Sequence, residues 1–154
     1  MNTKWLTDLC ACEEAVEWAR TQKGTRQEVW SRCNRADWML WLAARLCGNR
    51  GSPAHRAVVM AACACARTAL PHVPAGESRP LAAIELAERW ARGDDTVTVE
   101  MLCEAGDAVL AAARAAASVA ACAAARAAAR AAALARMAVL VRTFIPQCPE
   151  ECGR

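Results

Sequence analysis

The sequence contains no tyrosine and a single phenylalanine, Phe144, so six tryptophans supply nearly all of its aromatic side chains. β-branched residues are also sparse, and alanine dominates the second half of the chain. Because strands favour β-branched and aromatic residues while alanine is the best helix former, this composition argues against a sheet. With 154 residues the chain is long enough for one domain with a real core and short for two. We therefore expect an all-α fold.

The chain also lacks the signals of secretion and of membrane insertion. Its first residues show no basic segment followed by a continuous apolar stretch, which is the pattern of a secretory signal. Its apolar segment near the C-terminus is interrupted by charges that would be costly at the centre of a bilayer, namely Arg114, Arg126, Arg130 and Arg136. Most of the ten cysteines lie in alanine-rich helical patterns rather than in the loops of a disulfide framework. We expect a cytoplasmic protein without a membrane span.

Motifs for metal binding and catalysis are missing. The sequence has neither a CxxC pair nor a paired-histidine pattern, and the segments Cys10-Ala-Cys12 and Cys63-Ala-Cys65 would place their thiols about 200° apart on a helix. No nucleophile elbow lies near either histidine, and the seven glycines form no phosphate-binding loop. We therefore expect no metal, no cofactor and no catalytic residue.

Start and stop signals divide residues 1–145 into about six to seven helices, which we expect to form one orthogonal or bundle-like domain. The helices are expected over residues 8–20, 26–33, 34–48, 53–70, 80–92 and 99–144. Thr25 and Glu28 have the spacing of a capping box. Asn34 is expected to cap the next helix, with Asp37 in its first turn.

The last helical segment carries five arginines and no acid between residues 108 and 149, while the net charge of the chain is only +3. One straight helix over 99–144 would be about 70 Å long, so we expect a break at Ser118 and Val119. The modest net charge argues against binding of duplex nucleic acid. The small side chains of this segment would allow it to pair with a second copy, and a homodimer stays open. Residues 146–154 are expected to form a flexible tail.

Arginine and tryptophan recur together in three stretches of the chain. A guanidinium binds phosphate through two parallel hydrogen bonds, and an indole stacks on a base, so these residue types suit a nucleotide-like ligand. A carboxylate among them could orient an arginine. The alternative is that the tryptophans belong to the core and the arginines to the surface. The candidate ligand-binding residues of this kind are Arg35, Asp37, Trp38, Arg67, Arg79 and Trp90.

Glu85 and Glu88 lie one turn apart in the expected helix 80–92. Such a pair of carboxylates could act in acid-base chemistry or hold a cation. The simpler interpretation, which we favour, is ion pairing of Glu85 with Arg89 and of Glu88 with Arg92 on a solvated face.

Three stretches of the sequence, WSRCNRADWMLWLAARL, RAVVMAACACARTALPHV and RPLAAIELAERWARG, are followed by the long alanine and arginine segment. In this order they resemble the immunity-protein family of bacteria and their phages, over most of residues 5–145. The resemblance implies a small cytosolic all-helical protein that neutralises a toxin or a defence component by binding it. Inside the matching stretches lie Arg35, Asp37, Trp38, Arg67, Arg79, Glu85, Glu88 and Trp90.

Two binding functions compete at this point. The first is sequestration of a small anionic nucleotide-like immune signal in an Arg and Trp pocket, as phage counter-defence sponges do. The second is neutralisation of a protein toxin by direct binding. We favour the first, because many toxin inhibitors present an acidic face to a basic nuclease, whereas this chain is basic and rich in tryptophan. A hydrolase using Asp37, His55 or the pair of Glu85 and Glu88 is the third interpretation.

Overall fold

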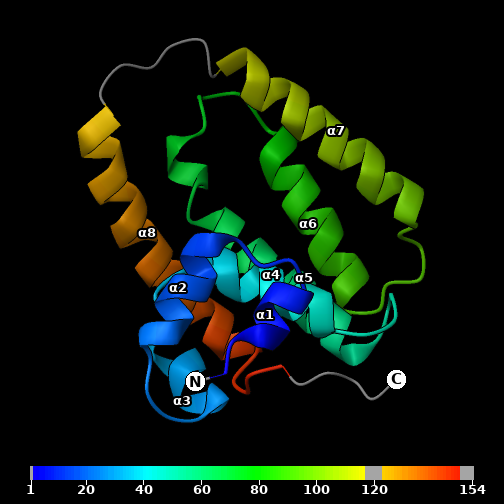
Figure 1. The fold of residues 1–154 in the computed structure, drawn as a ribbon. Coiled ribbons are helices and arrows are strands. Elements are labelled where there is room, and N and C mark those ends of the chain that lie inside the picture. The colour runs from blue at the N-terminus through cyan, green and yellow to red at the C-terminus, as the bar shows by residue number, and fades with distance from the viewer. Residues whose placement is uncertain (1, 117–122, 150–154) are drawn as a thin grey trace.

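The computed structural model describes residues 2–116 and 123–149, without the side chains of residues 108–129. Within those ranges the chain forms eight α-helices, one 3-10 helix and no strand, which confirms the all-α class and exceeds the expected number of helices slightly. The elements, drawn in Figure 1, are α1 (Lys4–Asp8), α2 (Glu13–Thr21), α3 (Arg26–Arg32), α4 (Ala36–Leu46), α5 (Pro53–Arg67), the 3-10 helix η1 (Leu70–His72), α6 (Arg79–Ala91), α7 (Val99–Ala116) and α8 (Ala123–Phe144).

The extra helix arises at the N-terminus, where the prediction of one helix over residues 8–20 is wrong. Helix α1 ends at Asp8 and α2 begins at Glu13. Between them Cys10 has a φ of +62°, in the left-handed region that turns the chain. Cys12 is extended and precedes two glutamates in the first turn of α2, where the helix dipole favours negative charge. Cys10 and Cys12 are therefore exposed loop residues, so helical geometry does not separate their thiols.

The predicted helix starts are largely confirmed. The Thr25 side chain accepts a hydrogen bond from the backbone of Glu28 at 3.2 Å, and Glu28 accepts one from the backbone of Thr25 at 2.6 Å, completing the capping box. Asn34 does not cap α4, because the N-cap residue is Arg35 and its side chain makes no capping bond. Asp37 does lie in the first turn, where its carboxylate accepts backbone hydrogen bonds. Asp37 therefore stabilises this helix start in place of Asn34.

The core lies where α4, α5 and α8 meet (Figure 1). Met39 of α4 and Val141 of α8 are the largest side chains that are fully buried, and small residues such as Ala61 and Ala138 are completely covered. Such small side chains let neighbouring helix backbones approach closely. Helix α6 packs on α5, and α7 packs along α6 on the side away from α8.

The C-terminal end of α8 is attached to the N-terminal helices by polar contacts. The Arg142 guanidinium donates to the backbone carbonyl of Cys33 at 2.6 Å, and the Trp30 indole donates to the carbonyl of Ile145 at 3.1 Å. Gln27 donates to the carbonyl of Pro146 at 2.9 Å and accepts from the backbone of Cys148 at 2.6 Å. The first residues of the expected tail are thus held against α3.

The expected break at Ser118 and Val119 lies outside the described residues, which end at Ala116 and resume at Ala123. The Thr98 side chain accepts a hydrogen bond from the backbone of Met101 at 3.3 Å, which is the contact that an N-cap residue makes at a helix start. Among the helices of residues 2–116 and 123–149, none combines the length and the hydropathy of a membrane span.

Candidate functional site

Arg35, Asp37 and Trp38 form one cluster at the start of α4. Two parallel hydrogen bonds of 2.9 Å join the Arg35 guanidinium to Asp37, and a third of 2.7 Å joins it to Glu14 of α2. The same guanidinium lies 3.9 Å from the ring centre of Trp38, which packs against Trp18 with ring centres 5.7 Å apart. The predicted contact of these three residues is therefore present.

One guanidinium faces two carboxylates in this cluster, so the cluster as a whole is negative. Burial by itself would raise the pKa of Asp37, but the hydrogen bonds and the charge of Arg35 outweigh burial and lower it. The hydrogen bond to Asp37 raises the pKa of Arg35 in turn. Three of the five N–H donors of Arg35 are directed at carboxylates, so a phosphate would have to compete with two negative charges for this guanidinium.

Arg67 and Glu88 form a second cluster, between α5 and α6. Arg67 donates two hydrogen bonds to the Glu88 carboxylate, at 2.6 and 2.9 Å, and Arg92 donates a third at 3.1 Å. The hydrogen bond from Arg67 is the main cause that lowers the pKa of Glu88. The predicted pair of Glu88 with Arg92 is confirmed, but Glu88 is only 7% exposed, so its expected position on a solvated face is wrong. It is buried because α5 covers it.

The predicted pairing of Glu85 with Arg89 does not occur among the described side chains. Arg89 instead donates to Asp94 at 2.8 Å and to Thr96 at 3.2 Å, in the turn that follows α6. The turn returns the chain close to the last residues of α6, so Asp94 competes successfully for this guanidinium. Glu85 is exposed on α6.

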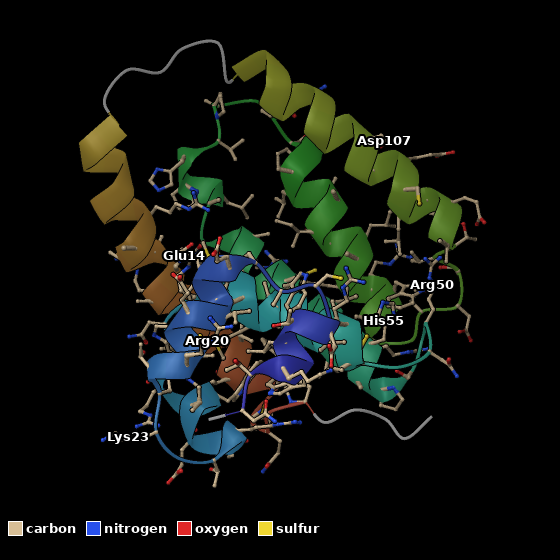
Figure 2. All side chains as sticks on the ribbon, in the orientation of Figure 1. Glu14, Arg20, Lys23, Arg50, His55 and Asp107 are labelled. Atoms are coloured by element: carbon tan, nitrogen blue, oxygen red, sulfur yellow. The ribbon has the colours of Figure 1, made fainter. Side chains whose placement is uncertain are left out.

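Arg79 and Trp90 lie at two further places. Arg79 is exposed and pairs with Glu77, with hydrogen bonds of 2.8 and 3.0 Å that lower the pKa of Glu77 to about 2. Trp90 makes an edge contact with His55, with ring centres 5.3 Å apart. The His55 Nδ1 atom accepts a hydrogen bond from the backbone of Gly51 at 3.0 Å. Figure 2 shows His55 at the start of α5, well away from Glu14 on α2.

The structure therefore distributes the eight predicted residues over separate places and does not bring them into one hollow. His55 and Arg67 stand twelve positions apart on α5, which corresponds to about 18 Å along the helix. In each place a carboxylate within hydrogen-bonding distance neutralises the arginine: Glu14 and Asp37 at Arg35, Glu88 at Arg67, and Glu77 at Arg79.

Acidic residues on α7 form a feature that the sequence reasoning missed. Residues 94–107 contain five acids and no base. Glu100, Glu104 and Asp107 are all exposed, and their spacing of four and three places them on one side of the helix. Figure 2 shows Asp107 on the outer side of α7, pointing away from α6. The local charge count was available in the sequence, but residues 1–107 as a whole contain 13 basic and 14 acidic side chains, and this near balance hid it.

No group of three or more metal-binding side chains is found in the part of the chain that the structure describes. Burial also raises the pKa of three core thiols, Cys33, Cys63 and Cys65, which keeps them protonated and unreactive.

Comparison with known families identifies residues 51–139 as a match to the family described as Imm-5 like putative immunity protein. No curated protein and no solved structure matches the chain. The match covers α5, η1, α6, α7 and most of α8, but not the cluster of Arg35, Asp37 and Trp38. It is narrower than the resemblance drawn from the sequence over residues 5–145, and it covers more than half of the 154 residues. The chain belongs to this Imm-5 like immunity-protein family.

Proposed function

We propose that this chain is a non-catalytic immunity protein that neutralises a protein toxin by direct binding. The binding surface is the acidic face of α7, formed by Glu100, Glu104 and Asp107. The observation that carries the proposal is the exposure of these three carboxylates on one side of a helix that lies inside the family match. The family supports a partner to be neutralised, and the charge of this face supports a basic one.

The acidic face has the composition of a contact surface. Met101 lies beside it with 39% of its area exposed, which adds an apolar group among the carboxylates. Backbone hydrogen bonding in the first turn of α7, together with the Thr98 side chain, lowers the pKa of Glu100, so this carboxylate is ionised at neutral pH. None of the described ion pairs involves Glu100, Glu104 or Asp107. Their charges are therefore free to act on a partner.

A partner with a basic active surface fits this face best. Complementary charge accelerates association and opposes the wrong partners, and it loses strength as salt screens it. The net charge of the whole chain, +3, favoured an anionic ligand when only the sequence was considered. The distribution of charge over the fold reverses that preference, because the acids of α7 lie together while the three candidate arginines, Arg35, Arg67 and Arg79, are paired with carboxylates.

Sequestration of a small anionic nucleotide-like signal is the second proposal. The half-buried rings of Trp18 and Trp38, beside Arg35, support it, since indole faces stack on bases. It is the weaker proposal because Asp37 and Glu14 already accept hydrogen bonds from that arginine. A phosphate would have to compete with two carboxylates.

A matched pair of double variants tests the toxin proposal. In a co-expression assay, a bacterial strain produces one candidate toxin domain at a time together with this chain. The toxin domain whose inhibition of growth is relieved by this chain is identified as the partner. The substitutions Glu100→Lys and Glu104→Lys reverse the acidic face, and Glu13→Lys with Glu17→Lys is the control. Both pairs are exposed, four residues apart, and begin in the first turn of a helix. We expect the first variant to lose rescue and the control to keep it.

Incubation with a panel of cyclic nucleotides and dinucleotides separates the two proposals. The protein is removed by heat denaturation, and the nucleotides are measured before and after this step. If a nucleotide disappears from solution with the native protein and returns intact after denaturation, the result supports sequestration. The same result contradicts the toxin proposal if this chain also restores growth against none of the toxin domains. Chemical conversion of a nucleotide contradicts both proposals and indicates an enzyme.

A further inference from the structure

Five of the six tryptophans surround one cavity in the N-terminal half of the molecule, here called the tryptophan cavity. They are Trp5, Trp18, Trp30, Trp38 and Trp41. The cavity has a volume of about 70 Å³, and its other walls come from apolar side chains such as Leu6, Val29 and Met39. None of its lining residues belongs to the family match over residues 51–139, and none belongs to the acidic face.

The walls of the tryptophan cavity extend from the core to the surface. Trp30 and Met39 are buried, with 4% and 1% of their areas exposed, and form the inner side. Trp5, Trp18 and Trp38 are half-buried and reach the solvent. A ligand can therefore approach from the surface and place an apolar group against the core.

The indole N–H of Trp5 is a buried hydrogen-bond donor for which the described residues supply no acceptor. Among the described residues it is the one buried side-chain nitrogen or oxygen with no hydrogen-bond partner. Trp30, on the same cavity, satisfies its own nitrogen by donating to the Ile145 carbonyl. A buried donor without an acceptor is costly, so an oxygen supplied by a ligand would be bound favourably here.

Arg26 is the one charged residue in the lining of the tryptophan cavity. It is exposed, and its guanidinium lies 4.3 Å from the ring centre of Trp5. In contrast to Arg35, Arg67 and Arg79, it takes part in none of the described ion pairs. This guanidinium lies over the ring that carries the N–H donor without an acceptor, so an anionic oxygen bound here would meet a positive charge.

We propose that the tryptophan cavity binds a small branched aliphatic carboxylate. The aliphatic group fills the cavity, and the carboxylate pairs with Arg26 at the rim and directs one oxygen inward to the buried N–H of the Trp5 indole. The volume of the cavity limits the size of the ligand's apolar group. An apolar cavity of about 150 Å³ holds benzene, so a cavity about half as large holds about three or four carbon atoms. An isobutyl group has this size and contains no polar atom that would have to be buried.

Titration with isocaproate tests the site through the indole N–H signals of the six tryptophans in a nitrogen-proton correlation spectrum. We expect saturable shifts, the largest being a downfield shift of the Trp5 signal as it gains an acceptor. The neutral isostere isocaproamide should bind about threefold to fivefold more weakly, as expected for one exposed charge pair. Equal affinity for the acid and the amide, or no saturable shift, overturns the proposal.

Two pairs of variants check the location. Arg26→Ala should reduce the affinity for isocaproate to that for the amide, while Arg50→Ala, in the exposed loop before α5 (Figure 2), should not change it. Ala15 lines the cavity and Ala44 is exposed on α4. Ala15→Leu should abolish binding by filling the space, and Ala44→Leu should leave it intact. Binding that survives Ala15→Leu in a folded protein contradicts the site.

An isobutyl group next to a carboxylate occurs both in a free branched-chain acid and in a leucine at the carboxyl end of a peptide. Titration with acetyl-glycyl-leucine distinguishes these two sources. Tighter binding of isocaproate supports the site as one for a free acid, and tighter binding of the dipeptide supports it as one for a chain end.

Discussion

Arg67 on α5 and Glu88 on α6 are joined by two parallel hydrogen bonds of 2.6 and 2.9 Å. The carboxylate is almost fully buried, while the side chain of Arg67 is 40% exposed. Two-point contacts of this kind fix the relative position of the two helices as well as stabilising them. The pair therefore holds α6, and with it α7 and its acidic face, against the core.

Glu88→Gln should lower the free energy of unfolding by about 1–3 kcal/mol, because Arg67 and Arg92 lose a charged acceptor. Glu17→Gln is the control, since Glu17 is exposed on α2 and takes part in none of the described ion pairs. Urea denaturation of both variants measures the difference. Equal stability of the two variants would show that the Arg67 contact contributes nothing to the fold.

The pH dependence of stability should reflect the same carboxylate. Its folded pKa is lowered below the ordinary value of 4.5, so the stabilisation is fully present above about pH 5 and is lost as the pH falls through the lowered value. Since a glutamine side chain cannot titrate, the difference in unfolding free energy between the parent and Glu88→Gln should shrink on acidification. A difference that stays constant between neutral and acidic pH would contradict this assignment.

Arg142→Ala should destabilise the protein by about 1.5–3 kcal/mol, because its guanidinium donates to the Cys33 carbonyl where α3 leads into α4. Arg136→Ala, on the same helix but exposed, should change stability by less than about 0.5 kcal/mol. Thermal unfolding followed by circular dichroism compares the two. Similar melting temperatures would remove Arg142 from the set of structural contacts.

Replacement of Trp30 and of Trp38 by alanine should lower the free energy of unfolding by different amounts. Trp30→Ala should cost about 3–5 kcal/mol of stability, since the ring is 4% exposed and its nitrogen bonds Ile145. Trp38→Ala should cost about 1–2 kcal/mol, because its ring is only half-buried beneath Arg35. Chemical denaturation ranks the two variants, and the reverse order would contradict the burial described above.

Local signals in the sequence predicted the helices well. The capping box at Thr25, the proline at the start of α5 and the acid in the first turn of α4 all act within one helical turn, so they can be recognised without knowledge of the fold. The break after α1 was missed because it depends on a left-handed Cys10, and cysteine gives no signal for that conformation.

The candidate site was predicted less well, for a physical reason. Residue types suggested that arginines and tryptophans meet, and at Arg35 and Trp38 they do. The sequence could not show that Glu88 turns inward to Arg67, because this contact depends on the packing of α6 against α5. The pair of Glu77 and Arg79 is two residues apart in the chain, so its spacing was visible in the sequence and was missed. A charge count over windows of one helix would have found the acids of α7.

The decisive measurement is isothermal titration calorimetry of the purified chain with the toxin domain that the co-expression assay identifies, at low and at high salt. We predict that Glu100→Lys with Glu104→Lys weakens binding at least about tenfold at low salt and reduces its salt dependence, while Glu13→Lys with Glu17→Lys does neither. Equal losses in both double variants, or an unchanged affinity in the first, would contradict the acidic face of α7 as the binding surface.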